Sequence, residues 1–355
     1  MLTGKNLVYA LLVFVPVSLY LGVTHAAPTW VFVTSCLAIL PLAGIMGEAT
    51  ENLTHRVGPG LGGLLNATFG NAAELIIGFM ALRAGEHEIV KASLTGSIIG
   101  NILMVLGLAM LLGGWKRKEL TFNRLAAESG SSMMVLAVIA LVIPAIYAQV
   151  THHRQPQELE SISLDISFIL IVTYAASLVF SLKSHRRLFQ PEGASCAEEL
   201  EGEVWSLPRS LGMLVLAAVV IGLVSEYLVH AVDAAGQAMG LGKVFMGVVV
   251  VAIVGNAAEH STAVLVAMKG KMDLALSIAM GSSMQIALFV APVLVIAGHA
   301  LGQPLGLEFT ILEVVAVMFS VGAVTLLILD GKTNWFEGFQ LLAIYAILAF
   351  AFYYV

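Results

Sequence analysis

Two glutamates occur in the same five-residue motif at distant points of the chain. Glu74 ends the stretch GNAAE that begins at Gly70, and Glu259 ends an identical stretch that begins at Gly255. Each lies about halfway along an apolar run long enough to cross a bilayer, which takes about 20 residues. A carboxylate at the bilayer centre costs several kcal/mol unless it is paired, protonated or bound to a cation. We therefore interpret both glutamates as functional groups rather than structural ones.

The residues before each glutamate strengthen this interpretation. Asn71 and Asn256 stand three positions before their glutamates, on the same helical face. Gly70 and Gly255 precede them and can loosen the helix at that point. A helix break at membrane depth is tolerated where it lines a cavity, and it turns backbone carbonyls toward that cavity. We predict that these four residues bind a cation together with the glutamates.

The next apolar run of each copy adds neutral oxygens. Ser97 is followed one turn later by Asn101, and Ser282 is followed by Gln285. Two carboxylates with amide, hydroxyl and carbonyl oxygens favour a hard cation. About six to eight such oxygens suit Ca²⁺, whereas Mg²⁺ usually keeps more water. The imidazole of His260 is turned away from the adjacent glutamate on the helix, so we predict packing or support for it rather than direct ligation.

The two carboxylates also offer a route for proton coupling. In a low dielectric and without a cation, two facing carboxylates do not easily stay charged together. Protons and a divalent cation then compete for the same oxygens. A protein that changes between its two open states only when the site is neutralised exchanges one for the other. Cation-dependent transport by a Glu74→Gln variant would contradict this hypothesis.

Composition assigns these residues to a membrane protein. Hydrophobic residues make up 59% of the 355 residues and charged residues 11%, whereas a soluble domain has about 25% charged residues. Short polar loops separate the apolar segments. The sequence predicts an all-α membrane protein with eleven transmembrane helices, with approximate spans 6–24, 28–54, 60–83, 89–113, 122–148, 162–182, 207–234, 243–268, 272–299, 307–329 and 334–354.

An internal repeat organises these helices. Five helices, an odd number, separate equivalent positions, so the two copies must cross the membrane in opposite directions. Inverted repeats with a binding site at their interface are a recurring transporter design. A shift of 185 residues without a gap superposes the pairs Gly70/Gly255, Asn71/Asn256, Glu74/Glu259, Gly85/Gly270, Gly96/Gly281 and Ser97/Ser282.

The repeat defines four parts of the chain. Residues 1–26 form an extra leading helix, 27–183 the first repeat, 184–206 a cytoplasmic acidic linker and 207–355 the second repeat. Basic residues set the orientation. With the N-terminus in the cytoplasm and the C-terminus outside, four basic residues lie outside (Arg83, Lys91, Arg154 and Lys243) and thirteen inside: Lys5, Arg56, Lys116, Arg117, Lys118, Arg124, Lys183, Arg186, Arg187, Arg209, Lys269, Lys271 and Lys332.

Other acids give weaker signals. Glu48 and Glu51 lie near the cytoplasmic end of the second helix, where they line the inner mouth of the site or form a solvated helix end. Glu226 in the seventh helix is a candidate for a proton path. The linker acids are a solvated run or, alternatively, a cytoplasmic regulatory cation site: Glu198, Glu199, Glu201 and Glu203.

Several functional classes are excluded by what the sequence lacks. The pair His87-Glu88 has no second histidine at zinc-protease spacing, and no nucleophile stands near a base, so an enzyme is not expected. A phosphate-cradling loop is absent, which argues against ATP-driven transport. Cys36 and Cys196 show neither metal nor disulfide spacing and are expected to be free thiols. No cofactor is expected beyond the transported ions.

The paired motifs resemble the calcium/cation antiporter superfamily, and within it the cation/proton exchanger branch. The resemblance rests on 70–74 with 96–101 and on 255–260 with 281–285, and it covers nearly the whole chain. It implies alternate binding of Ca²⁺ and H⁺ at Glu74 and Glu259, with support from the neighbouring Asn, Ser and Gln side chains. It also implies two long gating helices, the second and the seventh, that slide against a static bundle.

One departure bears on the coupling ion. Sodium/calcium relatives carry a Thr-Ser-x-Pro-Glu type of motif and an aspartate in the second repeat, where this chain has Gln285 and Ile286. The resemblance therefore implies a secondary antiporter that exports Ca²⁺ against H⁺. Na⁺ coupling, Mn²⁺ as substrate and, less favoured, a passive cation channel remain alternatives. A bacterial plasma membrane is the preferred location, a vacuole-type membrane the alternative, and a homo-oligomer is compatible with either.

Overall fold

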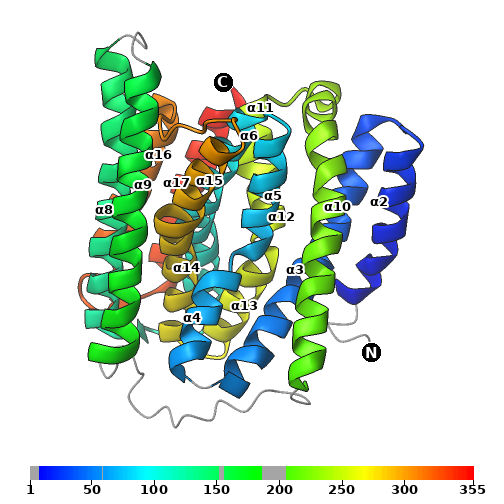
Figure 1. Cartoon of the computed structure of the whole chain (residues 1–355). Coiled ribbons are helices and arrows are strands. Elements are labelled where there is room, and N and C mark those ends of the chain that lie inside the picture. The colour runs from blue at the N-terminus through cyan, green and yellow to red at the C-terminus, as the bar shows by residue number, and fades with distance from the viewer. Residues whose placement is uncertain (1–7, 58, 152–155, 186–204) are drawn as a thin grey trace.

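Long apolar helices that run along one common direction build the structure (Figure 1). The computed structural model describes residues 8–57, 59–151, 156–185 and 205–355. Within them, seven helices are long and apolar enough to cross a membrane, and a bent pair makes up an eighth span. Two shorter apolar helices, Val8–Val23 and Ile311–Leu327, and the broken pair α4–α5 correspond to the remaining predicted segments. The chain is an integral, multi-pass membrane protein, and its helices are compatible with eleven crossings.

The first half of the chain begins with a leading helix and continues through a helix broken in its middle. Its last two helices, α8 and α9, stand side by side as a hairpin at the left of Figure 1. Its elements are a 3₁₀ turn Leu11–Val13, α2 Phe14–Val23, α3 Pro28–Val57, α4 Pro59–Phe69, α5 Ala72–Arg83, α6 His87–Ile99, a π-helical turn Gly100–Val105, α7 Leu106–Gly114, β1 Leu120–Thr121, α8 Arg124–Val150, α9 Pro156–Val179 and a π-helical turn Phe180–Ser184.

The second half repeats this order with small differences. Its elements are α10 Leu207–Met239, α11 Lys243–Phe245, a π-helical turn Met246–Val251, α12 Ala252–Gly255, α13 Ala257–Met268, α14 Met272–Gln285, a π-helical turn Ile286–Val290, α15 Ala291–Ala300, α16 Ile311–Leu327, β2 Lys332–Thr333 and α17 Trp335–Tyr353.

Both helices that carry the GNAAE motif are broken, and they run in opposite directions. The chain passes from α4 at the bottom of Figure 1 to α5 above it, and from α12 above to α13 below. In the second copy, the segments Lys243–Gly255 and Ala257–Met268 meet at a bend of 62°. The predicted breaks at Gly70 and Gly255 are therefore present, and the two half-helices that follow them point toward opposite faces of the bundle.

The two longest helices, α3 and α10, pack against each other at the right of Figure 1, with α2 against both. α10 also packs on α5, and α3 on α12 and α13. These are the second and seventh predicted crossings, the pair expected to act as gates. Their contacts with both broken helices place them where a shift would change access to the motif residues.

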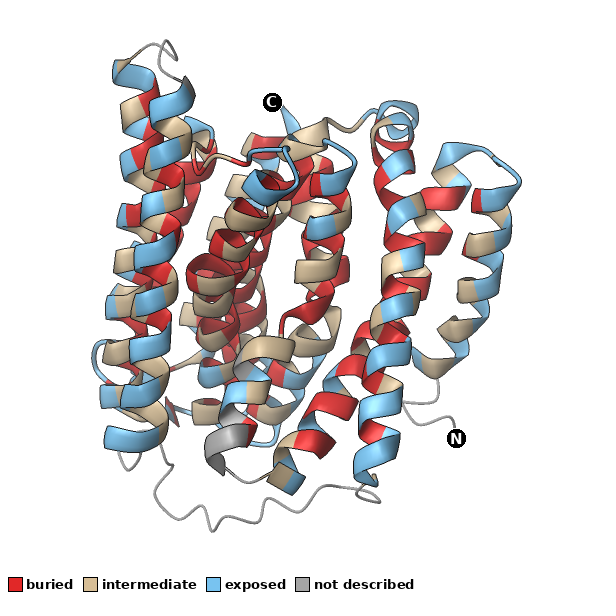
Figure 2. Ribbon diagram, in the orientation of Figure 1, coloured by how far each residue is buried: buried red, intermediate tan, exposed pale blue. Residues whose placement is uncertain are grey.

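Burial separates a central group of helices from a lipid-facing rim (Figure 2). In the most apolar window, 78% of the residues of His87–Gly114 are buried, against 22% for Gln157–Ser184 and 17% for Trp335–Tyr353. Large apolar side chains such as Phe168, Val172 and Leu216 are exposed on the rim. This is expected when the surrounding solvent is lipid, because apolar surface then needs no cover.

Interloop contacts define the two faces of the bundle. At one face, β1 pairs antiparallel with β2, the backbone N–H of Asn123 donates to Asp273, and Trp205 lies beside the end of α3. At the opposite face, Lys243 binds the loop before α6. We call these the Trp205 face and the Lys243 face. The β1–β2 ladder joins the loop between the fourth and fifth predicted crossings to the loop between the tenth and eleventh. The prediction of eleven crossings also places both loops on the same side of the membrane.

Candidate functional site

The helix breaks set the position of both motif glutamates. Asn71 and Asn256 occupy the N-cap positions of α5 and α13, and Glu74 and Glu259 follow in the first helical turn. The N-terminus of a helix carries partial positive charge, which stabilises a nearby carboxylate by about 0.3–1 kcal/mol. Two such termini approach each other from opposite directions. The local structure therefore favours anionic groups at the site, although it offsets only part of their desolvation.

Neither N-cap asparagine caps its own helix with its side chain. Each instead bonds to the other repeat. Asn71 Nδ2 donates to Gln285 Oε1 at 2.5 Å, and Ser282 Oγ donates to Asn71 Oδ1 at 2.7 Å. The same hydroxyl also contacts the Glu259 carboxylate, which takes the hydroxyl proton instead when Glu259 is ionised. The amide of the first repeat thus supports the glutamate of the second.

The equivalent hydrogen-bond network around Asn256 in the second repeat has different partners. Asn256 Nδ2 donates to Ser97 Oγ at 2.7 Å, and Asn101 Nδ2 donates to Asn256 Oδ1 at 3.1 Å. His260 Nε2 lies 3.0 Å from Asn101 Oδ1. Because that oxygen only accepts, the imidazole must carry its proton on Nε2. The predicted supporting role of His260 thus takes the form of a contact that extends this network.

Glu74 differs from Glu259 in its contacts. Among the described residues, the Glu74 carboxylate accepts from its own backbone N–H but from no other side chain, and it lies close enough to Glu259 for the two charges to repel each other. Its side chain packs on Gly255, where an added Cβ would lie 3.5 Å from Oε1. It lines a cavity of about 10 Å³ with Ser93, Ser97 and Gly255 among others, room for about one water molecule. Glu74 is thus the carboxylate that lacks a donor from another side chain, whereas Glu259 has Ser282.

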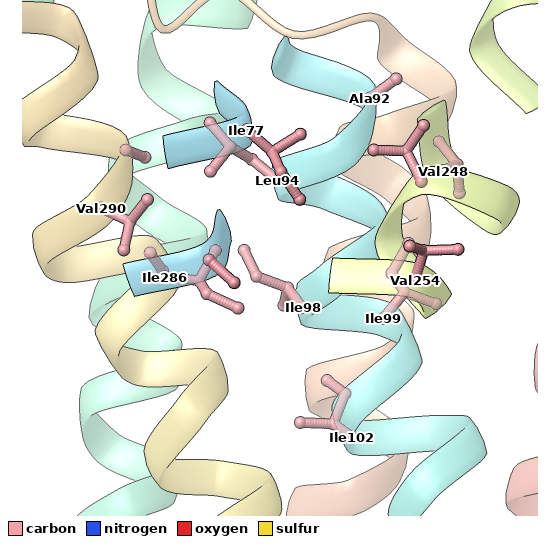
Figure 3. Packing of buried hydrophobic residues seen from close by; sticks show 14 of the residues in the cluster. Ile77, Ala92, Leu94, Ile98, Ile99, Ile102, Val248, Val254, Ile286 and Val290 are labelled. Carbon is pink, nitrogen blue, oxygen red and sulfur yellow. The ribbon is translucent and has the colours of Figure 1, made fainter. Parts of the chain in front are cut away.

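Buried apolar side chains from several elements pack together in the interior of the bundle (Figure 3). Ile77 of α5, Ile98 of α6, Val254 of α12 and Ile286 after α14 are all buried. The packing is close enough that a Cβ at Gly96 would stand 2.0 Å from the Val248 carbonyl oxygen. Glu74 and Glu259 are half-buried beside this packing, and the limited access of water strengthens their interaction with a cation.

The predicted core of the site comes together from both repeats. The breaks and hydrogen bonds above unite ten of the predicted residues in one cluster: Gly70, Asn71, Glu74, Ser97, Asn101, Gly255, Asn256, Glu259, Ser282 and Gln285. Within the described ranges, no three His, Cys, Asp or Glu side chains are grouped as a metal site. The donor set is thus two carboxylates with neutral oxygens, which fits a hard cation such as Ca²⁺.

The other predicted acids take separate positions. Glu48 of α3 accepts a hydrogen bond of 2.5 Å from the Tyr9 hydroxyl of the leading helix, and Glu51 is exposed. Glu226 is exposed on α10, and its backbone carbonyl accepts from His230. The linker acids at 198, 199, 201 and 203 lie outside the described residues, as does Cys196. Cys36 is buried in α3 as a free thiol.

Two features of the site could not be predicted from the sequence motifs. Asn101 lies in the π-helical turn Gly100–Val105, and Gln285 directly precedes the turn Ile286–Val290. Such turns are frequent at functional sites, because the extra residue changes which side chains face inward. They place Asn101 and Gln285 in similar roles although the 185-residue shift pairs Gln285 with Gly100.

Comparison with known proteins covers the whole chain. The family model described as sodium/calcium exchanger protein matches residues 27–183 and 209–354. A Ca(2+)/H(+) antiporter of Aphanothece halophytica is 45% identical over 100% of this chain and 98% of its own length. The Ca(2+)/H(+) antiporter ChaA of Bacillus subtilis (strain 168) is 44% identical over 96% of each chain.

A solved structure supports the fold directly. The structure of native YfkE superposes with a TM-score of 0.85 at 39% identity, over 98% of this chain and 99% of that one. The overall arrangement of the helices is therefore shared, over nearly the whole chain, with a solved structure.

Proposed function

Because this chain belongs to the sodium/calcium exchanger protein family, we propose that it is a secondary antiporter that moves Ca²⁺ across the membrane in exchange for H⁺. The observation that carries the proposal is the pairing of Glu74 and Glu259 at two helix breaks from opposite repeats. The relatives named as Ca(2+)/H(+) antiporters, at 44–45% identity over nearly full length, support the choice of ions. Transport, rather than catalysis, is the activity that the family carries.

The two glutamates bind either one Ca²⁺ or protons. Bound Ca²⁺ neutralises both carboxylates, and so do protons, whereas an empty site would leave uncompensated negative charge beside buried apolar side chains. Movement of α3 and α10 is therefore favoured only when the site is filled. Asn71, Asn256, Ser97 and Ser282 hold the carboxylates in place or add neutral ligands. This coupling makes the exchange obligatory.

The basic residues orient the molecule with its Trp205 face in the cytoplasm, the N-terminus inside and the C-terminus outside. The contacts β1–β2, Asn123–Asp273 and Arg56–Trp205 support this, because they gather most of the basic loops on one face. The bacterial relatives support a bacterial plasma membrane, where the protein exports Ca²⁺ as protons enter.

Uptake of ⁴⁵Ca by everted membrane vesicles with an acidic interior tests the proposal. The native chain is expected to accumulate Ca²⁺, to lose this activity on addition of a protonophore, and to be indifferent to Na⁺. Uptake that requires a Na⁺ gradient and survives the protonophore would replace H⁺ by Na⁺ as the coupling ion. Mn²⁺ added in excess measures whether it competes for the same site.

A further inference from the structure

A charged triad at the Lys243 face connects elements that belong to different moving parts. Lys243, at the start of α11, donates to Glu86 Oε2 at 2.5 Å and to Asp233 Oδ2 at 3.0 Å. Glu86 is the N-cap residue of α6, and Asp233 lies near the end of α10. The ammonium group is therefore shared between the central bundle and the long helix α10.

The connection between α10 and α11 is a short turn at a glycine. α10 ends at Gly240, whose φ of 71° lies in the left-handed region that favours glycine. Only Leu241 and Gly242 follow before α11 begins. The N–H groups of Gly240 and Leu241 donate to Gln237 and Gly236 and cap α10, and the Lys243–Asp233 ion pair closes the turn from the other side.

The cavity beside Glu74 extends toward this same face. Its lining includes Ser93, which lies between the Lys243-face end of α6 and Ser97, and Val251, which precedes Gly255 on the approach from Lys243. With space of about 10 Å³, it is closed to a hydrated cation. The structure therefore combines a closed path on the Lys243 side with an intact triad.

A second ion pair on the same face offers a contrast. Lys91 Nζ contacts Glu308 Oε1 at 2.8 Å and the Glu308 backbone oxygen at 2.8 Å. These residues join α6 to the segment before α16, and neither is on α3 or α10. The pair holds parts of the central bundle together, so it should not respond to movement of the long helices.

We propose that Lys243 is a latch that holds the end of α10 on the central bundle and keeps the path from the Lys243 face to Glu74 closed. The proposal rests on the alternating access described above. Opening this side requires the Lys243–Asp233 contact to break. Glu86 positions the ammonium group for Asp233, and it stays with the bundle in both states.

Cysteine accessibility tests the latch. Ser93→Cys is placed in a chain with Cys36→Ala and Cys196→Ser, and right-side-out vesicles are treated with a membrane-impermeant methanethiosulfonate. Lys243→Met and Asp233→Asn are each expected to raise the modification rate about fivefold, the effect of losing one partly exposed ion pair. Lys91→Met, the matched control, is expected to leave the rate unchanged, and Glu86→Gln to raise it less than Asp233→Asn does.

Asp233→Asn serves as a variant that is expected to fold, because it keeps the side-chain size and leaves the Lys243–Glu86 contact in place. Equal rates in the Lys243, Asp233 and Lys91 variants, whether raised or not, would overturn the latch. Proton-driven ⁴⁵Ca uptake by the native chain in everted vesicles is measured separately. Absence of that uptake would count against the proposed exchange, while the modification rates would still decide whether the triad controls access.

Discussion

The two copies of the motif hold their glutamates in different ways. Glu259 accepts a hydrogen bond from Ser282 of its own repeat, whereas the equivalent Ser97 and Glu74 share a cavity wall without a hydrogen bond between them. Asn71 donates a hydrogen bond to Gln285. Asn256 instead accepts from Asn101, which in turn accepts from His260. A pseudo-symmetric scaffold thus yields an asymmetric site with one anchored carboxylate and one free to change its ligand.

The hydrogen-bond directions sharpen this difference. Ser282 has a single proton but approaches two acceptors, the Asn71 amide oxygen and the Glu259 carboxylate. Ser282 therefore donates to Glu259 when that carboxylate is ionised, and it can donate to Asn71 when Glu259 is protonated and donates to Ser282. Ser97 instead accepts from Asn256 and keeps its own proton available on the side of Glu74. The Ser282 contact thus changes with the protonation of Glu259, and Glu74 has no equivalent contact.

Removal of either carboxylate should have the largest effect. Glu74→Gln and Glu259→Gln are each expected to reduce proton-driven Ca²⁺ uptake to background, because a single carboxylate leaves a bound divalent cation half neutralised. Glu74→Asp should retain more activity than Glu259→Asp, since only the latter withdraws from a hydrogen-bond donor. Equal loss in the two aspartate variants, measured as initial ⁴⁵Ca uptake, would remove the distinction between anchored and free carboxylates.

The paired glycines on α6 and α14 come next. Gly96→Ala should destabilise the protein by about 1–3 kcal/mol, the usual cost of overpacking, because the new methyl would meet the Val248 carbonyl oxygen. The equivalent Gly281 has open space within 4 Å of an added Cβ, so Gly281→Ala is the matched control. Thermal unfolding in detergent should be lowered only for the Gly96 variant. Comparable shifts would mean that the two copies pack alike there.

The equivalent serines should differ in apparent Ca²⁺ affinity. Ser282→Ala removes a donor to a charged group and is expected to weaken binding about tenfold or more, whereas Ser97→Ala removes a neutral partner of Asn256 and should cost about two- to threefold. Concentration dependence of ⁴⁵Ca uptake measures both. A larger loss in Ser97→Ala would assign the anchored role to Glu74 instead.

The smallest expected effect comes from making the copies more alike. His260→Leu installs the residue found at the equivalent position, Leu75, and breaks the contact with Asn101. The loss should be at most about twofold in apparent affinity, the low end of the value of one partly buried neutral hydrogen bond. His260→Gln can keep a donor there and should recover part of the loss. No difference between these variants would make the imidazole a packing group alone.

Much of the architecture was predictable from the sequence. The 185-residue repeat and the alternation of apolar segments predict crossings in opposite directions, and the breaks at Gly70 and Gly255 follow from glycine beside a buried acid. The π-helical turns could not be predicted, because an extra residue per turn leaves no compositional mark. The contacts Asn71–Gln285 and Asn101–His260 depend on these turns and on side-chain directions across repeats, which no linear spacing encodes. Ion pairs between loops that are distant in sequence, such as Lys243 with Glu86, are likewise set only by tertiary packing.

Equilibrium binding of ⁴⁵Ca to the purified protein tests the central claim most directly, that glutamates of the two repeats form one site. The native chain is expected to bind a single Ca²⁺ at this site, and Glu74→Gln and Glu259→Gln are each expected to abolish it. Binding of two ions by the native chain, with one retained in each single variant, would show that the glutamates serve separate sites and would contradict the account.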